Sequence, residues 1–295
     1  MPRDADPARP AASPERRPTA AAGRRLPARK RWGQHFLAAP ETAERIVEAA
    51  RLGPQDTVLE VGPGEGALTR SIAERGPRLV AVEIDPLRAE ALSREFAGNA
   101  RVAVLRGDVL EKPFSRWLAE AGWSGPAVLV GNLPYNAATP ILSRAIEEPE
   151  AVSRCVATVQ REVARRFAAR PGGEGYGYLS VRTAAFARAR VLFDLPPSAF
   201  RPRPKVVSSV LELSPRGSGL DATLRRRALA LASLGFRSRR KTLANALSAI
   251  GPRAGWEQAL TAMGKSARAR AEELSLEDYL ELSRRVPQDA SRKAT

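Results

Sequence analysis

The sequence predicts an α/β fold, in which a mostly parallel sheet with helices on both faces is joined to a small all-α C-terminal domain. Two observations indicate the sheet: short apolar runs alternate with helical stretches, and a glycine-rich turn follows the first run. The third observation is that the apolar spacing beyond about residue 220 is helical only.

Five short apolar runs are the predicted parallel strands of this sheet. They lie at residues 57–61, 79–83, 102–105, 127–130 and 156–159. Helices are predicted to begin near Ala67 and Pro86, after the first and second of these strands. Two later runs, 189–193 and 206–213, have no long helix between them, so we expect an antiparallel hairpin at the edge of the sheet.

Composition divides the chain into four predicted parts. Residues 1–28 are rich in Pro, Ala and Arg and have no apolar period, which predicts a disordered basic tail. The sheet domain is predicted over 29–214, the helical domain over 221–286 and a short tail over 287–295. Within the helical domain, the apolar spacing predicts helices at about 222–236, 238–250, 255–263 and 276–286.

Composition also limits the class of protein. Hydrophobic residues make up 43% of the 295 residues, enough for a core, so global disorder is excluded. One Cys and one His rule out an internal disulfide and disfavour a metal site, so we expect no metal. No apolar run is long enough to cross a membrane and no apolar signal segment begins the chain, so we expect a cytoplasmic location. The net charge of +16 predicts a polyanionic partner, most often nucleic acid.

The turn after the first strand is the first candidate binding site. Gly62, Gly64 and Gly66 have the spacing G-x-G-x-G, which is typical of S-adenosylmethionine (SAM) methyltransferases, whereas dinucleotide-binding proteins have G-x-G-x-x-G. Glu83 ends the second strand, where a carboxylate can accept hydrogen bonds from ribose hydroxyls. Asp108 follows the third strand and can accept one from an exocyclic amine. The alternatives are a dinucleotide site and a purely structural glycine turn.

The tetrapeptide Asn132-Leu133-Pro134-Tyr135 follows the fourth strand and is the candidate catalytic element. The exocyclic N6 of adenine is a poor nucleophile, because its lone pair is delocalised into the ring. Two acceptors aimed at its N–H groups favour a more tetrahedral nitrogen. The Asn132 side-chain oxygen and the Leu133 carbonyl, turned inward by Pro134, are the candidate acceptors, and Tyr135 can stack on the base. An ordinary Asn-Pro turn is the alternative.

Four segments resemble the motifs of one family. Residues 29–37 look like its R-K-R-F-G-Q-N-F-L, 132–140 like N-L-P-Y-N-x-x-T-P, 195–206 like V-P-P-S-A-F-x-P-x-P-K-V, and 235–245 like F-x-x-R-R-K-T-(I/L)-x-N. From about residue 29 to 286 the chain thus resembles the KsgA/RsmA family of ribosomal RNA adenine N6,N6-dimethyltransferases. The resemblance implies a Rossmann-like, SAM-dependent methyltransferase fold.

The resemblance also implies roles for particular residues. Those that would bind SAM are His35, Leu37, Gly62, Glu83, Asp108 and Asn132. Tyr135 and Phe200 would sandwich the target adenine, and prolines around Phe200 would hold its ring at little entropic cost. His35 stands where the family often has Asn. Either its imidazole still makes a hydrogen bond in the site, or it is a packing or surface residue.

Basic residues in two of these segments are the predicted RNA contacts. They are Arg201, Arg203, Lys205, Arg237, Arg239, Arg240 and Lys241. The first three lie near Phe200, so cations that can meet phosphates lie beside an aromatic ring that can stack on a base. The glycine-rich segment 170–177 is either a loop that becomes ordered on RNA or a plain connector.

The expected function is therefore SAM-dependent dimethylation of two adjacent adenosines in the 3′-terminal hairpin of 16S rRNA. The resemblance implies a partly assembled 30S particle as substrate, a role in small-subunit biogenesis and a monomeric enzyme. Two alternatives stay open: an Erm-type methyltransferase acting on 23S rRNA, and a non-catalytic ribosome assembly factor. The segments 195–206 and 235–245 favour the 16S function.

Overall fold

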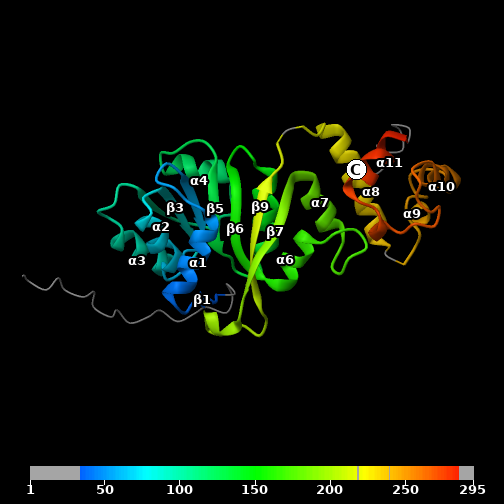
Figure 1. Cartoon of the computed structure of the whole chain (residues 1–295). Coiled ribbons are helices and arrows are strands. Elements are labelled where there is room, and N and C mark those ends of the chain that lie inside the picture. Colours follow the sequence, from blue (N-terminus) through cyan, green and yellow to red (C-terminus); the bar gives the residue numbers. More distant parts are fainter. Residues whose placement is uncertain (1–33, 218, 239, 286–295) are drawn as a thin grey trace, which may run out of the picture.

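The computed structural model describes residues 34–217, 219–238 and 240–285 (Figure 1). The predicted tails at 1–28 and 287–295 and the predicted RNA contact Arg239 lie outside the described residues.

A seven-stranded sheet forms the centre of the molecule, in the order β4-β3-β2-β5-β6-β9-β7. The five parallel strands are β2 (Thr57–Val61), β3 (Arg78–Glu83), β4 (Val102–Arg106), β5 (Ala127–Asn132) and β6 (Val152–Gln160). The antiparallel strands are β7 (Ala187–Leu195) and β9 (Ser208–Pro215), with β9 between β6 and the edge strand β7. The prediction of a mostly parallel sheet with an antiparallel edge hairpin is confirmed.

Helices cover both faces of the sheet, because successive strand residues point in opposite directions. Val58 packs with Ile46 and Ile72 on one face, whereas its neighbour Leu59 packs with Phe114 and Ile141 on the other. The first face is covered by α1 (Pro40–Ala50) and α2 (Ala67–Glu74), and the second by α4 (Phe114–Glu120), α5 (Ala138–Glu147) and α6 (Arg161–Ala168). The remaining helices beside the sheet are α3 (Pro86–Glu95) and α7 (Tyr178–Phe186). Because both faces of the sheet are buried, the parallel strands are nearly continuous apolar runs.

The C-terminal helices gather at one end of the molecule around a second apolar cluster (Figure 1). They are α8 (Ala222–Arg237), α9 (Leu243–Ala246), α10 (Arg253–Ala262) and α11 (Leu276–Arg285). The predicted helix 238–250 is wrong. The Lys241 N–H donates to the Ser238 carbonyl in a turn, and the Thr242 hydroxyl then accepts from the Asn245 N–H, so a new and shorter helix begins after Thr242.

The segment 170–177 lies between α6 and α7 and contacts the C-terminal part of the chain. The Gly172 N–H donates to the Glu272 carbonyl at 2.8 Å, and the buried Tyr176 hydroxyl donates to the Leu274 carbonyl at 2.7 Å. Tyr176 also packs in the C-terminal cluster, together with Val181 and Ala185 from the sheet-domain side. The segment joins α6 to α7 and contacts the C-terminal part of the chain, and the two alternatives that the sequence leaves open both stay predictions.

A second, two-stranded sheet was not expected from the sequence. It pairs β1 (Phe36–Leu37) with β8 (Phe200–Arg201) in antiparallel register, and the Ala38 N–H adds a 2.8 Å hydrogen bond to the Ala199 carbonyl. We call residues 34–38 the N-terminal strap. The strap joins the start of the described chain to the loop that precedes β9. No described helix is long and apolar enough to cross a membrane.

Candidate active site

The turn between β2 and α2 has the conformation that its glycines allow. Gly62, Gly64 and Gly66 have φ values of +69°, +58° and +80°, which side-chain-bearing residues rarely adopt. At Gly64 space is short as well: an added Cβ would lie 2.8 Å from a ring carbon of Phe36 in the strap. Gly62 and Gly64 also line the cavity described below, so a ligand there can approach the backbone of the turn.

Glu83 at the end of β3 holds this turn in place. Its carboxylate accepts hydrogen bonds from the N–H groups of Gly64 and Asp85, both at 2.8 Å. The side chain is buried, and burial raises the pKa of its carboxyl above the ordinary value. Each carboxylate oxygen has a second lone pair, which leaves acceptor capacity for a ligand hydroxyl.

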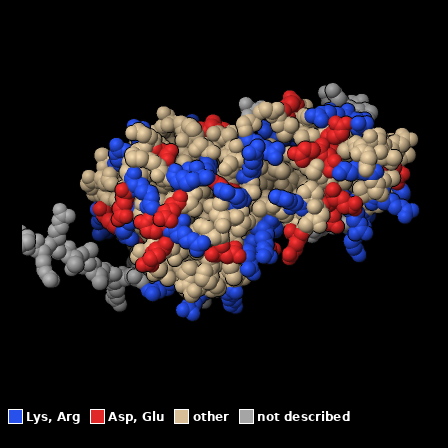
Figure 2. Space-filling model, viewed as in Figure 1, with Lys and Arg blue, Asp and Glu red and all other residues tan. Residues whose placement is uncertain are grey.

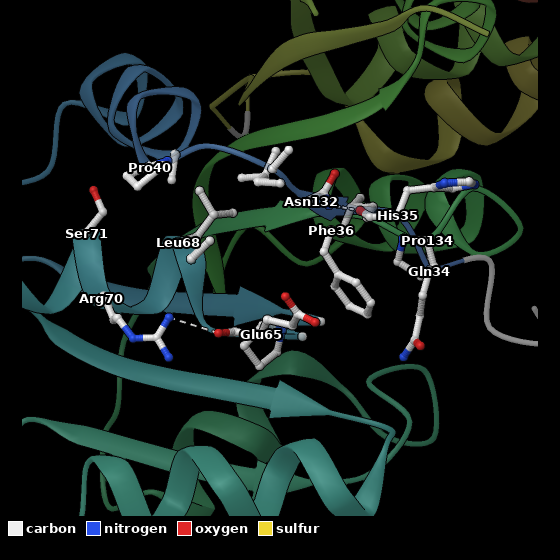
Figure 3. A pocket seen from close by; sticks show the side chains of 18 of the residues that line it. Gln34, His35, Phe36, Pro40, Glu65, Leu68, Arg70, Ser71, Asn132 and Pro134 are labelled. Carbon is white, nitrogen blue, oxygen red and sulfur yellow. Dashed lines mark hydrogen bonds between the residues drawn. The ribbon is translucent and has the colours of Figure 1, made fainter. Parts of the chain in front are cut away.

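A cavity of about 390 Å³ opens between the glycine turn, the strap and the end of β5 (Figure 3). The predicted site residues that line it are His35, Leu37, Gly62, Gly64, Glu83, Asn132, Leu133, Pro134 and Tyr135. Segments that are distant in the sequence therefore meet at one cavity, whose volume is in the range of small-ligand sites. SAM fits the two features nearest the turn: backbone that a ligand can approach, and a buried carboxylate with free lone pairs.

Asp108 lies at the same edge of the sheet but does not line this cavity. It follows β4, whose Arg106 pairs with Glu83 of β3. Its carboxylate accepts a 2.9 Å hydrogen bond from the Leu110 N–H, which fixes the turn after the strand. Its predicted contact with a ligand amine stays a prediction.

Asn132 has a defined side-chain orientation. Its Nδ2 donates a 2.6 Å hydrogen bond to the carbonyl of His35, so the strap holds the amide nitrogen (Figure 3). The amide oxygen is thereby left for a ligand. The next residue is fixed too, since the Leu133 N–H donates to the Thr158 carbonyl at 3.1 Å. The strap and β6 thus orient the first half of the tetrapeptide.

Tyr135 makes a polar contact through its hydroxyl and an aromatic contact through its ring. Its hydroxyl hydrogen-bonds the Ser208 hydroxyl at 2.7 Å, and its ring stacks on His35 with 5.2 Å between centroids and 28° between planes. Partial burial raises the pKa of the Tyr135 hydroxyl. The Nδ1 of His35 lies 2.7 Å from the Pro202 carbonyl and donates to it. This hydrogen bond is made to the chain itself, so the expected role of the His35 imidazole in binding SAM stays a prediction.

Phe200 is buried beside the cavity and does not line it, so its predicted place in an adenine sandwich with Tyr135 stays a prediction. Its side chain is 2% exposed and packs in the core with Leu195 and Val210. The pairing of Leu37 with Phe200 between β1 and β8 accompanies this burial. In this structure the ring that faces Tyr135 is that of His35. The burial of Phe200 could not be predicted from the sequence, because nothing in the sequence indicates the pairing of β1 with β8.

The predicted RNA contacts that the structure describes are all exposed. They are Arg201, Arg203, Lys205, Arg237, Arg240 and Lys241. The first three follow Phe200 beside the strap, and the last three lie at the end of α8. Figure 2 shows Lys and Arg side chains gathered over the middle of one face, where α6 lies in Figure 1. This charge distribution suits a polyanion that spans both parts of the molecule.

Sequence reasoning missed one residue that lines the cavity, Phe36, and one buried carboxyl group that lies outside the lining, Glu60. The ring of Phe36 hangs from the strap into the cavity toward the glycine turn (Figure 3), and it lies 4.6 Å from the guanidinium of Arg88. Its place in the 29–37 motif was the available signal. Glu60 on β2 is fully buried, and neither carboxylate oxygen has a hydrogen-bond partner among the described residues. Burial, with the charge of Glu83 adding to it, raises the pKa of Glu60 to about 8.

Comparison with known proteins supports the interpretation of this site. Residues 25–288 match the model of the family described as "Ribosomal RNA adenine dimethylase". The chain is 40% identical over 259 residues to ribosomal RNA small subunit methyltransferase A of Methylococcus capsulatus, which covers 88% of this chain and 97% of that protein. It is 41% identical to the protein of the same name from a Synechococcus species, and the match covers 86% of this chain and 91% of that protein.

Solved structures agree with the fold. The 23S rRNA methyltransferase ErmE superposes with a TM-score of 0.69 at 29% identity, covering 86% of this chain and all of that one. A dimethyladenosine transferase from Plasmodium falciparum gives the same TM-score at 22% identity, covering 84% and 96%. The family match and the relatives agree with the resemblance that the sequence motifs indicate. The chain belongs to the ribosomal RNA adenine dimethylase family, and it is a SAM-dependent adenine dimethyltransferase that acts on ribosomal RNA.

Proposed function

We propose that this enzyme dimethylates N6 of two adjacent adenosines in the 3′-terminal hairpin of 16S rRNA. The observation that carries the chemistry is the convergence of the glycine turn, Glu83 and Asn132 on one cavity. The choice of the small subunit rests on the two relatives named as small-subunit methyltransferases, which are 40% and 41% identical to this chain. The 23S rRNA methyltransferase ErmE is less similar, with 29% identity to this chain.

Gly62, Gly64 and Glu83 would hold SAM, with Leu37 of the strap closing the cavity from the other side. SAM supplies the methyl group from a positively charged sulfonium. Glu83 would accept from the ribose hydroxyls through the lone pairs that the backbone of the turn does not use. Asp108 is proposed to accept from the adenine amine of SAM. The residues proposed to hold SAM have a binding role, and none of them needs to transfer a proton.

Asn132 and Leu133 would activate the target nitrogen. The Asn132 Oδ1 and the Leu133 carbonyl accept from the two N–H groups of the adenine amine, which favours the tetrahedral nitrogen from which a methyl group can be attacked in line. The hydrogen bond from Asn132 Nδ2 to the His35 carbonyl sets this orientation before the substrate arrives. Preorganised acceptors of this kind lower the barrier without reorganising during the reaction.

Tyr135 would be the stacking platform for the target base. Its ring is fixed by the hydrogen bond between its hydroxyl and Ser208. The basic residues 201–205 and 237–241 would contact phosphates on either side of the base. The resemblance to the KsgA/RsmA family supports a monomer that works in the cytoplasm on an immature 30S particle.

A methyl-transfer assay tests this function. Purified full-length protein is incubated with labelled SAM and with 30S or 50S particles that lack their own adenine methylation, and the RNA is digested to nucleosides. We expect N6,N6-dimethyladenosine from 30S particles alone. Product from 50S particles alone would establish the Erm-type alternative. No label in either, with SAM still bound, would indicate a binding-only assembly factor.

A further inference from the structure

His35 carries the one imidazole of this chain, and its ring covers a face of Tyr135. The two rings are stacked, with 5.2 Å between centroids and 28° between planes. Tyr135 itself is held in place through the hydrogen bond of its hydroxyl to Ser208. The chain therefore places one of its own aromatic rings on the platform that its substrate base is proposed to use.

The backbone and the ring of His35 are held by different contacts. The backbone carbonyl accepts from Asn132 Nδ2, and the strap around it pairs with β8 through Phe36 and Leu37. Among the described residues the ring has one polar contact, from Nδ1 to the Pro202 carbonyl, and this hydrogen bond is exposed to solvent. An exposed hydrogen bond exchanges easily for bonds to water. The ring can thus leave Tyr135 by side-chain rotation while the strap stays in place.

We propose that the His35 imidazole is a stand-in for the target base: in the free enzyme it occupies the face of Tyr135 on which the adenine stacks, and the adenine displaces it. This inference rests on the proposed function, which puts the adenine on Tyr135. An imidazole has the size and planarity of the five-membered ring of a purine. The complete purine has a larger π face, so it competes successfully for the same aromatic surface.

The stand-in has a measurable consequence for RNA affinity. When a binding-competent state is only partly populated, the apparent affinity falls by the populated fraction. If the imidazole covers Tyr135 about 70–90% of the time, it weakens RNA binding by about three- to tenfold. Removing the ring should therefore strengthen RNA binding. A ring that merely buttresses Tyr135 would give the opposite sign, because its loss would loosen the platform.

The test compares wild type with His35→Ala and His35→Asn, both of which keep the backbone carbonyl that orients Asn132. The measured quantity is the KM for unmethylated 30S particles at saturating SAM. We expect both variants to lower this KM by about three- to tenfold. An unchanged or raised KM would overturn the inference. Val191→Ala, a surface truncation outside the cavity, reports the experimental scatter. If the wild type itself transfers no methyl group, the proposed function fails, and the inference fails with it.

A second measurement tests the free state directly. Because the chain has a single His, the imidazole protons of full-length protein labelled with 13C-histidine give one identifiable NMR signal set. In the free wild type we expect these signals to be displaced by the ring current of Tyr135. Tyr135→Leu should return them to the positions of a solvent-exposed histidine. Identical His35 signals in the two proteins would contradict the stacking on which the inference depends.

Discussion

At the scale of single residues, a hydrogen bond decides what Asn132 can do. The sequence predicts an acceptor at this position, but an amide can point its oxygen or its nitrogen into the site. The His35 carbonyl takes the nitrogen, at 2.6 Å, and so leaves the oxygen for the substrate. Residue types and their order in the chain could be predicted, whereas this orientation depends on a strap that is distant in the sequence.

Glu60 should make the stability of the protein fall with rising pH. Its pKa is raised to about 8 by burial, while an unfolded Glu titrates near 4.3. Between these values the folded carboxyl keeps a proton that the unfolded one has lost, so stability decreases by about 1.4 kcal/mol per pH unit. Below this window both forms are protonated, and above it neither is.

Glu60→Gln removes that titration. The variant should gain stability relative to wild type as the pH rises from 5 to 8, measured by urea unfolding at several pH values. Glu48→Gln, at an exposed position on α1, is the control and should show no such trend. Parallel stability curves for wild type and Glu60→Gln would show that Glu60 does not titrate as described.

Gly64→Ala should weaken SAM binding by about tenfold or more. The added Cβ would lie 2.8 Å from the Phe36 ring, and the backbone has a φ of +58° that costs an L-residue about 1–2 kcal/mol. Calorimetry of SAM binding measures the effect. Gly172→Ala is the matched control, since φ there is +72° but nothing lies within 4 Å of the new Cβ. Equal SAM affinity for wild type and Gly64→Ala would mean that the turn does not contact SAM.

At the scale of elements, short strands escaped prediction and long ones did not. The five parallel strands each carry enough apolar residues to be recognised alone. Strands β1 and β8 have two residues each, and they exist only because the folded chain brings them together. The same pairing accompanies the burial of Phe200, a tertiary contact that its sequence motif does not indicate. The prediction of a helix at 238–250 was wrong for a local reason, because Thr242 caps a new helix that begins at Leu243.

The segment between α6 and α7 should contribute to the stability of the C-terminal helices. Tyr176→Phe deletes the hydroxyl that donates to the Leu274 carbonyl in a buried position. Leaving that carbonyl without its donor should lower the free energy of unfolding by about 1–3 kcal/mol. Thermal or urea unfolding measures it. Tyr178→Phe, two residues along and partly exposed, should change stability by less than about 0.5 kcal/mol. Similar values for the two variants would contradict this role.

At the scale of the whole molecule, the positive charge and the elongated shape both suit the binding of RNA. The chain carries a net charge of +16, and its predicted RNA contacts lie both beside the strap and at the end of α8. Composition alone predicted a polyanionic partner. Which basic residues are exposed follows only from the fold, as does the arrangement of the two groups on one elongated molecule (Figure 1).

The salt dependence of RNA binding should identify the phosphate contacts. Replacing Arg201, Arg203 and Lys205 by Ala removes three cations, so the slope of log K against log salt should fall by about two for single-stranded RNA. The control removes equal charge at exposed arginines that already pair with acidic neighbours: Arg94, Arg253 and Arg285. RNA affinity measured across a salt series gives both slopes. Equal slopes for the two triple variants would place the phosphates elsewhere.

The central claim is that Asn132 activates the target nitrogen, and single-turnover methyl transfer by Asn132→Ala tests it most directly. The rate constant is measured on unmethylated 30S particles, and calorimetry on the same preparation checks that SAM still binds. We predict a rate constant at least about 10²-fold below wild type, the usual effect of removing one preorganised catalytic hydrogen bond. A rate constant equal to that of the wild type, with SAM bound, would contradict the account.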